Sequence, residues 1–322
     1  MLKKFSILNG TIVDNVPSNN NIWVYINPDT QEKNFLINTL QIDESDIASA
    51  LDPEEVPRLM FDPDYITLIW KQPRNVMGKQ SPFFNVTSAG IFIKQDRLIF
   101  VLGEDLSLFE KRYPHKVESV FDVLFNFLYH SIHHYLGHLR VIKQISGEVQ
   151  SKINTAMENE YLIQMFSLSE SLVYYLNAIS GNHAALLKLR NYCERTEQLK
   201  NKIELLDDVM IENNQCSKQA EIYSQVLSGL MDARGNLISN NMNVLIKNLT
   251  LINVIFLPLN LLASIGGMSE FSMMTHGVDW RISYSLFLIA MFALGWMTQV
   301  IINKFGIGVI FFLNKRDKKL ES

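Results

Sequence analysis

The sequence predicts an α/β domain that leads into one long helix and two C-terminal helices that cross a membrane. Short runs of β-branched and aromatic residues, bounded by turn residues, lie within the first 102 residues and indicate strands. No proline occurs between Lys116 and Pro258, and the apolar periodicity of that stretch is typical of helices. Nearly all of the long apolar runs lie after residue 244, which predicts membrane segments in the C-terminal part.

The composition fits this organisation and excludes other classes of protein. The chain has 322 residues, with 29 Lys and Arg against 33 Asp and Glu, so its formal net charge is −4. With 48% hydrophobic residues it is too apolar for a disordered chain, and it lacks the basic excess of a nucleic-acid binder. It contains no glycine-rich phosphate loop and no HExxH motif, so neither a nucleotide site nor an enzyme is predicted. Cys193 and Cys216 are too few for a disulfide framework and are expected to be reduced thiols.

The first 183 residues are expected to form a cytosolic α/β domain with a helical hairpin. Its helix over 43–51 is predicted to end where Asp52-Pro53 interrupts the pattern. Later helices are expected over 117–155 and 158–180, followed by a stalk helix over 184–248 that continues into the membrane. The strands are predicted at 21–27, 65–71, 89–94 and 98–102.

Two apolar segments are long enough to cross a bilayer, which takes about 17–25 mostly apolar residues. Residues 249–265 form a run of 17 without charge, which carries Asn253, Pro258 and Asn260 and continues the helical pattern before it. Residues 282–302 are a further 21 without charge, within a second span expected over 282–303. The alternative, two buried helices of a soluble protein, fits less well, because a short glycine-rich loop separates the runs and a basic tail follows them.

The basic residues predict the orientation of the spans. Lys247 precedes the first span, whereas the loop 266–281 has no Lys or Arg before Arg281. The tail 304–322 contains the basic run Lys315-Arg316-Asp317-Lys318-Lys319. Because Lys and Arg stay on the cytoplasmic side, both termini are expected in the cytoplasm and the loop outside. Residues 305–313 are too short to cross again, and they either lengthen the second span or lie at the interface.

A mostly polar stripe along the long helix is the most informative pattern. Its members alternate between spacings of four and three, which places them on one side of a helix. A polar stripe that faces lipid is costly, so several copies of the helix are expected to surround a water-filled pore. Alternatively, the Asn and Thr side chains bond between helices without conduction. The stripe consists of Gln225, Gly229, Asp232, Asn236, Ser239, Asn243, Ile246, Thr250, Asn253, Leu257, Asn260 and Ser264.

Residues 239–271, SNNMNVLIKNLTLINVIFLPLNLLASIGGMSEF, carry a family resemblance. They resemble the CorA family of divalent-cation channels, in which a stalk helix runs into the first span and ends in a Gly-Met-Asn signature. Residues 51–73, LDPEEVPRLMFDPDYITLIWKQP, are a weaker match to an acidic-proline stretch of that family. Residues shared with the family include Ser239-Asn240, Asn243, Lys247, Leu249-Thr250, Phe256, Pro258-Leu259, Ala263 and Gly267-Met268.

The resemblance implies a homopentamer with a funnel-shaped αβα cytosolic domain, a stalk helix that lines the pore and a second span outside it. It implies divalent cations, Mg²⁺ or a transition metal, as cargo, with no resident cofactor and no nucleotide or nucleic-acid partner. Ile246, Leu249 and Leu257 would form an apolar constriction that gates by dewetting. The implied lining residues are Asp232, Asn243, Ile246, Leu249, Asn253, Leu257, Asn260 and Ser264, followed by the signature Gly267-Met268-Ser269.

The signature departs from the family pattern at Ser269, where the family has Asn. A ring of hydroxyls would be wider than a ring of carboxamides and would hold the waters of a hydrated ion differently. Mg²⁺ keeps its waters tightly, so its selectivity is left open. A zinc or other transition-metal transporter similar to the ZntB branch, and a non-conducting membrane scaffold, remain alternatives. The Gly266-Gly267 pair is expected to allow tight turns at the pore mouth.

Two further groups are candidate metal ligands. His130, His134 and His138 share one face of a predicted helix, and adjacent pairs have the spacing to hold Zn²⁺ or Ni²⁺. The alternative is a helix stripe without metal. The resemblance also implies regulatory divalent ions between cytosolic domains, at positions that Asp46 and Asp208 match. The alternative for both carboxylates is a solvated helix face.

Overall fold

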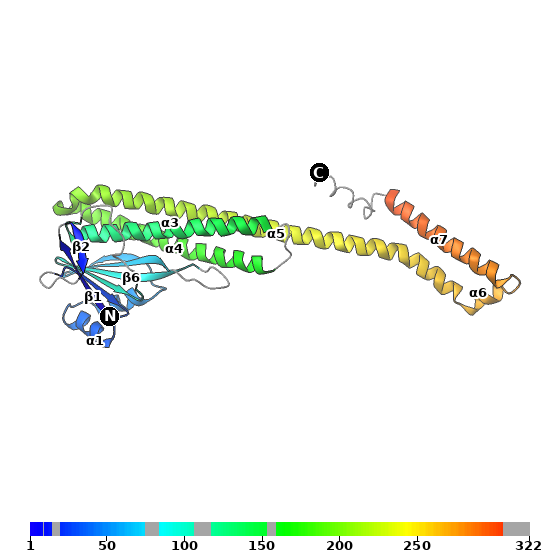
Figure 1. The fold of residues 1–322 in the computed structure, drawn as a ribbon, viewed down its shortest axis with the longest axis horizontal. Helices are drawn as coiled ribbons and strands as arrows, with labels where there is room; N and C mark the ends of the chain where they lie inside the picture. The colour runs from blue at the N-terminus through cyan, green and yellow to red at the C-terminus, as the bar shows by residue number, and fades with distance from the viewer. Residues whose placement is uncertain (9, 15–19, 75–83, 106–116, 153–158, 305–322) are drawn as a thin grey trace. The chain divides into compact units, whose positions relative to one another are not determined.

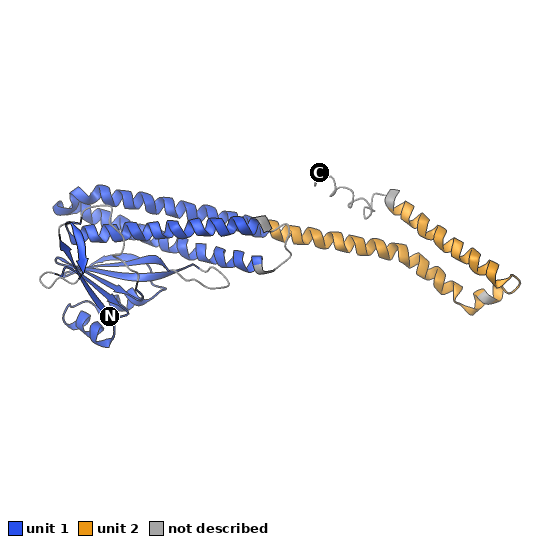
Figure 2. Cartoon of the chain, in the orientation of Figure 1, with its two compact units in different colours: residues 1–232 blue, residues 233–322 orange. Residues whose placement is uncertain are grey.

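The computed structural model describes residues 1–8, 10–14, 20–74, 84–105, 117–152 and 159–304. The chain divides into two compact units, 1–232 and 233–322 (Figure 2). One helix, α5 (Ile203–Gly266), runs from the first unit into the second. Residues 305–313 and the basic run after them, both considered above, lie outside the described residues.

The first unit is built on a mixed β-sheet (Figure 1). Its described strands have the order β2-β1-β3-β7-β6-β5-β4, in which β3 and β7 are parallel and all other neighbours antiparallel. β7 is buried on both faces, which explains its continuous apolar run. The strands are β1 (Leu2–Leu8), β2 (Thr11–Asp14), β3 (Ile22–Ile26), β4 (Arg58–Phe61), β5 (Ile66–Arg74), β6 (Asn85–Lys94) and β7 (Arg97–Leu102).

Helices cover both faces of this sheet (Figure 1). The helices of the first unit are α1 (Thr30–Asn38), α2 (Glu44–Leu51), α3 (Val120–Lys152), α4 (Asn159–Arg195), the short 3₁₀ helix η1 (Glu197–Lys202) and the first part of α5. On one face, α1 and α2 bury Leu36 and Ile47 against Phe92 of the sheet. On the other face, Trp70 belongs to a larger cluster with α3, α4 and α5. Gly90 allows α2 to approach β6, because a Cβ there would lie 2.2 Å from the Cβ of Ala50.

Most elements of the first unit were predicted. The expected strands are confirmed as β3, β5, β6 and β7, and the expected helices as α2, α3 and the first part of α4. The elements that the sequence analysis missed are β1, β2, β4, α1 and η1.

The predicted helix break between residues 180 and 184 is wrong. α4 continues to Arg195, and α5 begins at Ile203, after η1. Gly181 does not end the helix. It allows α4 to approach Pro57 closely, because a Cβ at this position would lie 2.7 Å from Cγ of Pro57. Asn182 is fully buried and bonds the backbone of Lys71 in β5. The boundary expected at 183/184 therefore moves to residues 196–202, where Thr196 has an extended backbone.

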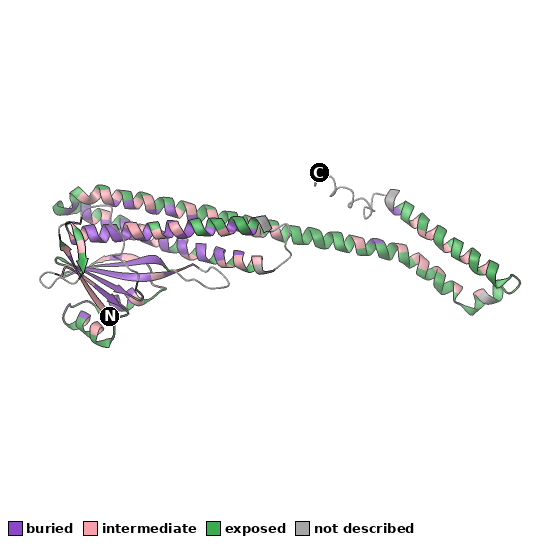
Figure 3. Ribbon diagram, viewed as in Figure 1, coloured by how far each residue is buried: buried purple, intermediate pink, exposed green. Residues whose placement is uncertain are grey.

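In the second unit, the described residues form the rest of α5, α6 (Ser269–Met274) and α7 (Trp280–Lys304). α5 and α7 are the two described helices long and apolar enough to cross a membrane, and they contain the two apolar segments of the sequence. Most of their apolar side chains are exposed (Figure 3), unlike those of core helices in a soluble protein. Phe287 of α7 packs against Gly266, where a Cβ would lie 2.6 Å from the Cζ of Phe287.

Candidate pore and cation sites

The predicted pore residues all lie on α5, and each is exposed in the single chain. The side chain of Leu257 is 70% exposed, and those of Leu249 and Ile246 are 60% and 55% exposed, so no described part of the chain covers the expected constriction. Large apolar side chains that remain this exposed mark a surface that meets lipid or another chain. The exposed members are Asp232, Asn243, Ile246, Leu249, Asn253, Leu257, Asn260 and Ser264.

Three carboxamides on this face have no hydrogen-bond partner among the residues that the structure describes. Thr250 satisfies its own hydroxyl by donating to the carbonyl of Ile246 at 2.8 Å. By contrast, Asn243, Asn253 and Asn260 make no hydrogen bond to any described residue. A polar group without a partner in hydrocarbon costs several kcal/mol. Asn253 and Asn260, which lie within the first apolar segment, therefore require water or another chain.

The signature residues lie where α5 ends and α6 begins. The N–H of Gly267 donates to the carbonyls of Ala263 and Ser264, and that of Met268 donates to Ile265 at 3.1 Å. Met268 then has an extended backbone as the N-cap of α6, which Ser269 begins. The chain does turn at Gly266-Gly267, as expected, but neither glycine has a positive φ, so the turn does not depend on the left-handed conformation that glycine allows. The Gly266 position instead makes room for the ring of Phe287.

Ser269 is exposed, and its hydroxyl donates to the carboxylate of Glu270 at 3.2 Å. In the single chain, the group that replaces the family's carboxamide is therefore bonded to an acidic neighbour. A hydroxyl that gives its proton to Glu270 still accepts hydrogen bonds from water. The start of α6 thus carries a hydroxyl oxygen and a carboxylate side by side.

The two aspartates expected in a regulatory site have different surroundings. Asp208 is exposed and makes no hydrogen bond or ion pair with a described residue, whereas its neighbour Asp207 binds Nε of Arg190 at 2.6 Å. Asp46 is only 5% exposed and accepts hydrogen bonds from the hydroxyls of Tyr65 and Thr67, each at 3.1 Å. Because α2 and α5 pack on opposite faces of the sheet, one chain does not bring Asp46 and Asp208 together.

The three histidines of α3 do not form a metal site. Among the described residues, no group of three or more His, Cys, Asp and Glu side chains is arranged to hold a metal ion. His138 is 8% exposed, and its Nδ1 lies 2.5 Å from the hydroxyl of Tyr175. Burial, followed by the nearby His134, lowers the pKa of His138 to about 4. The stripe formed by His130, His134 and His138 therefore turns inward at its last member, which is neutral at physiological pH.

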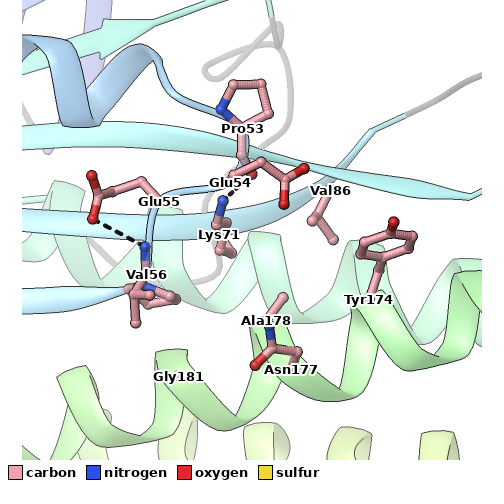
Figure 4. A pocket seen from close by; sticks show the side chains of 11 residues that line it. Pro53, Glu54, Glu55, Val56, Lys71, Val86, Tyr174, Asn177, Ala178 and Gly181 are labelled. Carbon is pink, nitrogen blue, oxygen red and sulfur yellow. Dashed lines mark hydrogen bonds between the residues drawn. The ribbon is translucent and has the colours of Figure 1, made fainter.

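The structure also shows a cavity that the sequence analysis missed. It has a volume of about 90 Å³ and lies between residues 53–57, β5 and α4 (Figure 4). Lys71 donates to the carbonyl of Pro53 beside it. Burial lowers the pKa of Lys71, and the nearby carboxylates of Glu54, Asp52 and Glu55 oppose that shift. Residues 53–57 and Lys71 belong to the acidic-proline stretch 51–73, but the α4 residues that complete the lining are about 100 residues further along the chain, so the stretch alone does not predict the cavity.

Comparison with known proteins gives a consistent match over most of the chain. The family described as CorA-like Mg²⁺ transporter protein matches residues 18–304. The cobalt/magnesium transport protein CorA of Methanocaldococcus jannaschii is 26% identical over 246 residues, which cover 73% of this chain and 75% of that protein.

Two solved structures share the fold. The complete CorA magnesium transporter of Methanocaldococcus jannaschii superimposes with a TM-score of 0.75 at 20% identity, over 94% of this chain and 96% of that one. The ZntB cytoplasmic domain of Vibrio parahaemolyticus has a TM-score of 0.60 at 14% identity, over 74% of this chain and 98% of that one. At these identities the structures support the fold alone.

Proposed function

Because the chain belongs to the CorA-like Mg²⁺ transporter family, we propose that it conducts divalent metal cations through a pore lined by copies of α5. It is an integral membrane protein with two apolar C-terminal helices. The observation that carries the proposal is the exposed face of α5, on which carboxamides without partners recur at helical spacing. In an assembly these groups face water, which removes the cost of placing them in lipid.

A single copy of α5 cannot enclose a pore, so the proposal includes a homopentamer. Exposed apolar side chains such as Met242, Leu245 and Phe256 are available to pack against neighbouring copies and α7. Both termini lie in the cytoplasm, and the loop between α5 and α7 lies outside, since it has no Lys or Arg before Arg281.

The pore chemistry follows from the side chains along α5. Carboxamide oxygens of Asn243, Asn253 and Asn260 accept hydrogen bonds from the first-shell waters of a hydrated cation. Rings of Ile246, Leu249 and Leu257 close the pore by dewetting when they approach the axis. No nucleotide is needed, because a divalent ion gains roughly 4.6 kcal/mol per 100 mV on entering a cell with a negative interior, at about 2.3 kcal/mol per charge.

We assign the regulatory carboxylate to Asp208 and not to Asp46. Asp208 is exposed on α5 and free to bind a divalent ion together with groups of a neighbouring copy. The Asp46 carboxylate already accepts two internal hydrogen bonds that hold α2 to β5. An ion shared between copies stabilises the closed assembly, so internal divalent ions reduce conduction.

Flux measurement in liposomes tests the proposal. The purified full chain is reconstituted, and the uptake of Mg²⁺, Co²⁺, Ni²⁺ and Zn²⁺ is measured with ion-sensitive dyes under an inside-negative potential. Uptake of at least one divalent ion that rises with the potential is expected. Uptake of a transition metal without Mg²⁺ would favour the ZntB-like alternative. Impermeability to all four ions would contradict the proposal and favour a scaffold.

A further inference from the structure

The end of α6 and the turn that follows it carry an unusual group of exposed side chains. Met273 is 77% exposed and Met274 is 87% exposed, although methionine is normally a core residue. His276 follows them and is also exposed. Two thioethers and an imidazole thus lie within four consecutive residues, and nothing in the described part of the chain covers them.

Backbone hydrogen bonds hold this segment in a compact turn. The N–H of His276 donates to the carbonyl of Met273 at 3.4 Å, which closes a four-residue turn. The Cα atoms at the two ends of such a turn lie less than about 7 Å apart. On either side, the N–H of Thr275 bonds Phe271 at 3.1 Å, and that of Val278 bonds Thr275 at 2.9 Å. The Met273 and His276 side chains therefore leave the backbone near each other.

The donor atoms point to one class of ligand. Thioether sulfur is a soft ligand that selects Cu(I), imidazole suits copper and other transition metals, and Mg²⁺ prefers oxygen. Methionine has three flexible side-chain bonds, so the sulfur atoms of Met273 and Met274 can both reach an ion held by His276. We propose that Met273, Met274 and His276 form a capture site for a soft monovalent transition-metal ion, Cu⁺ or its redox-inert analogue Ag⁺.

A membrane-interface role for the two methionines is the competing explanation. An interfacial anchor normally uses Trp or Tyr, and Trp280 already occupies that position, with the guanidinium of Arg281 5.5 Å from its ring centre. The methionines are followed by polar Thr275 and His276 instead of further apolar residues. The metal site explains why the imidazole accompanies the sulfur atoms, and the interfacial role does not.

Methyl NMR of the full chain in lipid nanodiscs tests this site without relying on transport. In a chain labelled with ¹³C-methyl methionine, one equivalent of silver nitrate is expected to shift the methyl signals of Met273 and Met274. The variants M273L and M274L identify these signals, because each variant lacks one of them. The signal of Met242, an exposed methionine on α5, should stay in place and serves as the control. Mg²⁺ should move none of these signals. H276Q should weaken Ag⁺ binding by about tenfold or more, since even outer-shell partners of a metal contribute about 10–100-fold to its affinity.

Other outcomes would overturn the inference. An interfacial role would be shown if the Met273 and Met274 signals do not change when Ag⁺ is added, or if they shift only on transfer from detergent micelles to nanodiscs. A Met242 signal that moves equally would show non-specific binding to thioethers. The inference rests on the proposed function in one respect only, the topology that places the loop between α5 and α7 outside. Divalent flux through the M273L/M274L variant is measured separately, so a failure of the pore proposal and a failure of this site are distinguishable.

Discussion

Replacing Asn182 should open the edge of the central sheet. β4 ends its pairing with β5 at Ile69, so the backbone of Lys71 faces no strand on that side. Asn182 of α4 takes the place of a strand, because its Oδ1 accepts from the Lys71 N–H at 3.0 Å and its Nδ2 donates to the Lys71 carbonyl at 2.7 Å. Asn182→Ala leaves both buried groups without partners, at about 1–3 kcal/mol each, or about 2–6 kcal/mol in total.

Hydrogen exchange of the full chain in detergent measures this loss directly. A loss of about 2 kcal/mol in local opening energy accelerates exchange by about 30-fold, so peptides that cover residues 70–74 should lose most of their protection in Asn182→Ala. Asn182→Asp keeps the size but faces the Lys71 carbonyl with a buried charge, and it should be at least as damaging. The control is Asn177→Ala, because Asn177 is exposed on the same helix and makes no hydrogen bond to a described residue. Unchanged exchange over 70–74 in Asn182→Ala would refute the reasoning.

The remaining predictions concern selectivity, regulation and pH. Ser269→Asn should raise Mg²⁺ flux relative to Zn²⁺ or Co²⁺ by about 5- to 150-fold, the equivalent of about 1–3 kcal/mol from water-mediated hydrogen bonds; identical ion ratios would place selectivity deeper in the pore. Asp208→Ala should make flux resistant to inhibition by internal divalent ions, and unchanged inhibition would reduce Asp208 to a solvated charge. The pKa of His138 is lowered to about 4, so the unfolded chain binds this proton more tightly. The contribution of neutral His138 to the free energy of unfolding is therefore complete above about pH 6.5 and is lost as the pH falls toward 4. His138→Gln should make the melting temperature depend less on pH over that range.

The sequence predicted the central strands because their apolar runs are long and bounded by turns. β4 was missed because it has four residues and little alternation, and its place in the sheet depends on antiparallel pairing with β5. α1 was missed although its start was visible. Asp29 and Glu32 form a capping box, in which the Asp29 carboxylate accepts from the Glu32 N–H at 2.8 Å. The helix buries only Leu36, so its apolar periodicity is faint.

In the candidate site, too, some residues could be predicted from local sequence, whereas the roles of others depend on contacts between distant segments. Spacing alone placed the candidate pore residues other than Leu249 on one side of a helix, because α5 is one continuous helix. The internal role of Asp46 was not predictable, because its partners, Tyr65 just before β5 and Thr67 within it, approach α2 only in the fold. Likewise, the choice between Asp207 and Asp208 depends on Arg190, which reaches α5 from α4.

Cysteine labelling of the α5 face during flux tests the central claim most directly. Native thiols give little background, because Cys193 and Cys216 are fully buried and burial raises their pKa to about 11 and about 12. The account predicts that a small hydrophilic thiol reagent modifies cysteine at Asn243, Asn253 or Asn260 and blocks flux. Val254→Cys, which is exposed in the single chain but lies off the polar face, should neither react nor block. Equal modification and block at Val254 would contradict the assignment of this face to the pore.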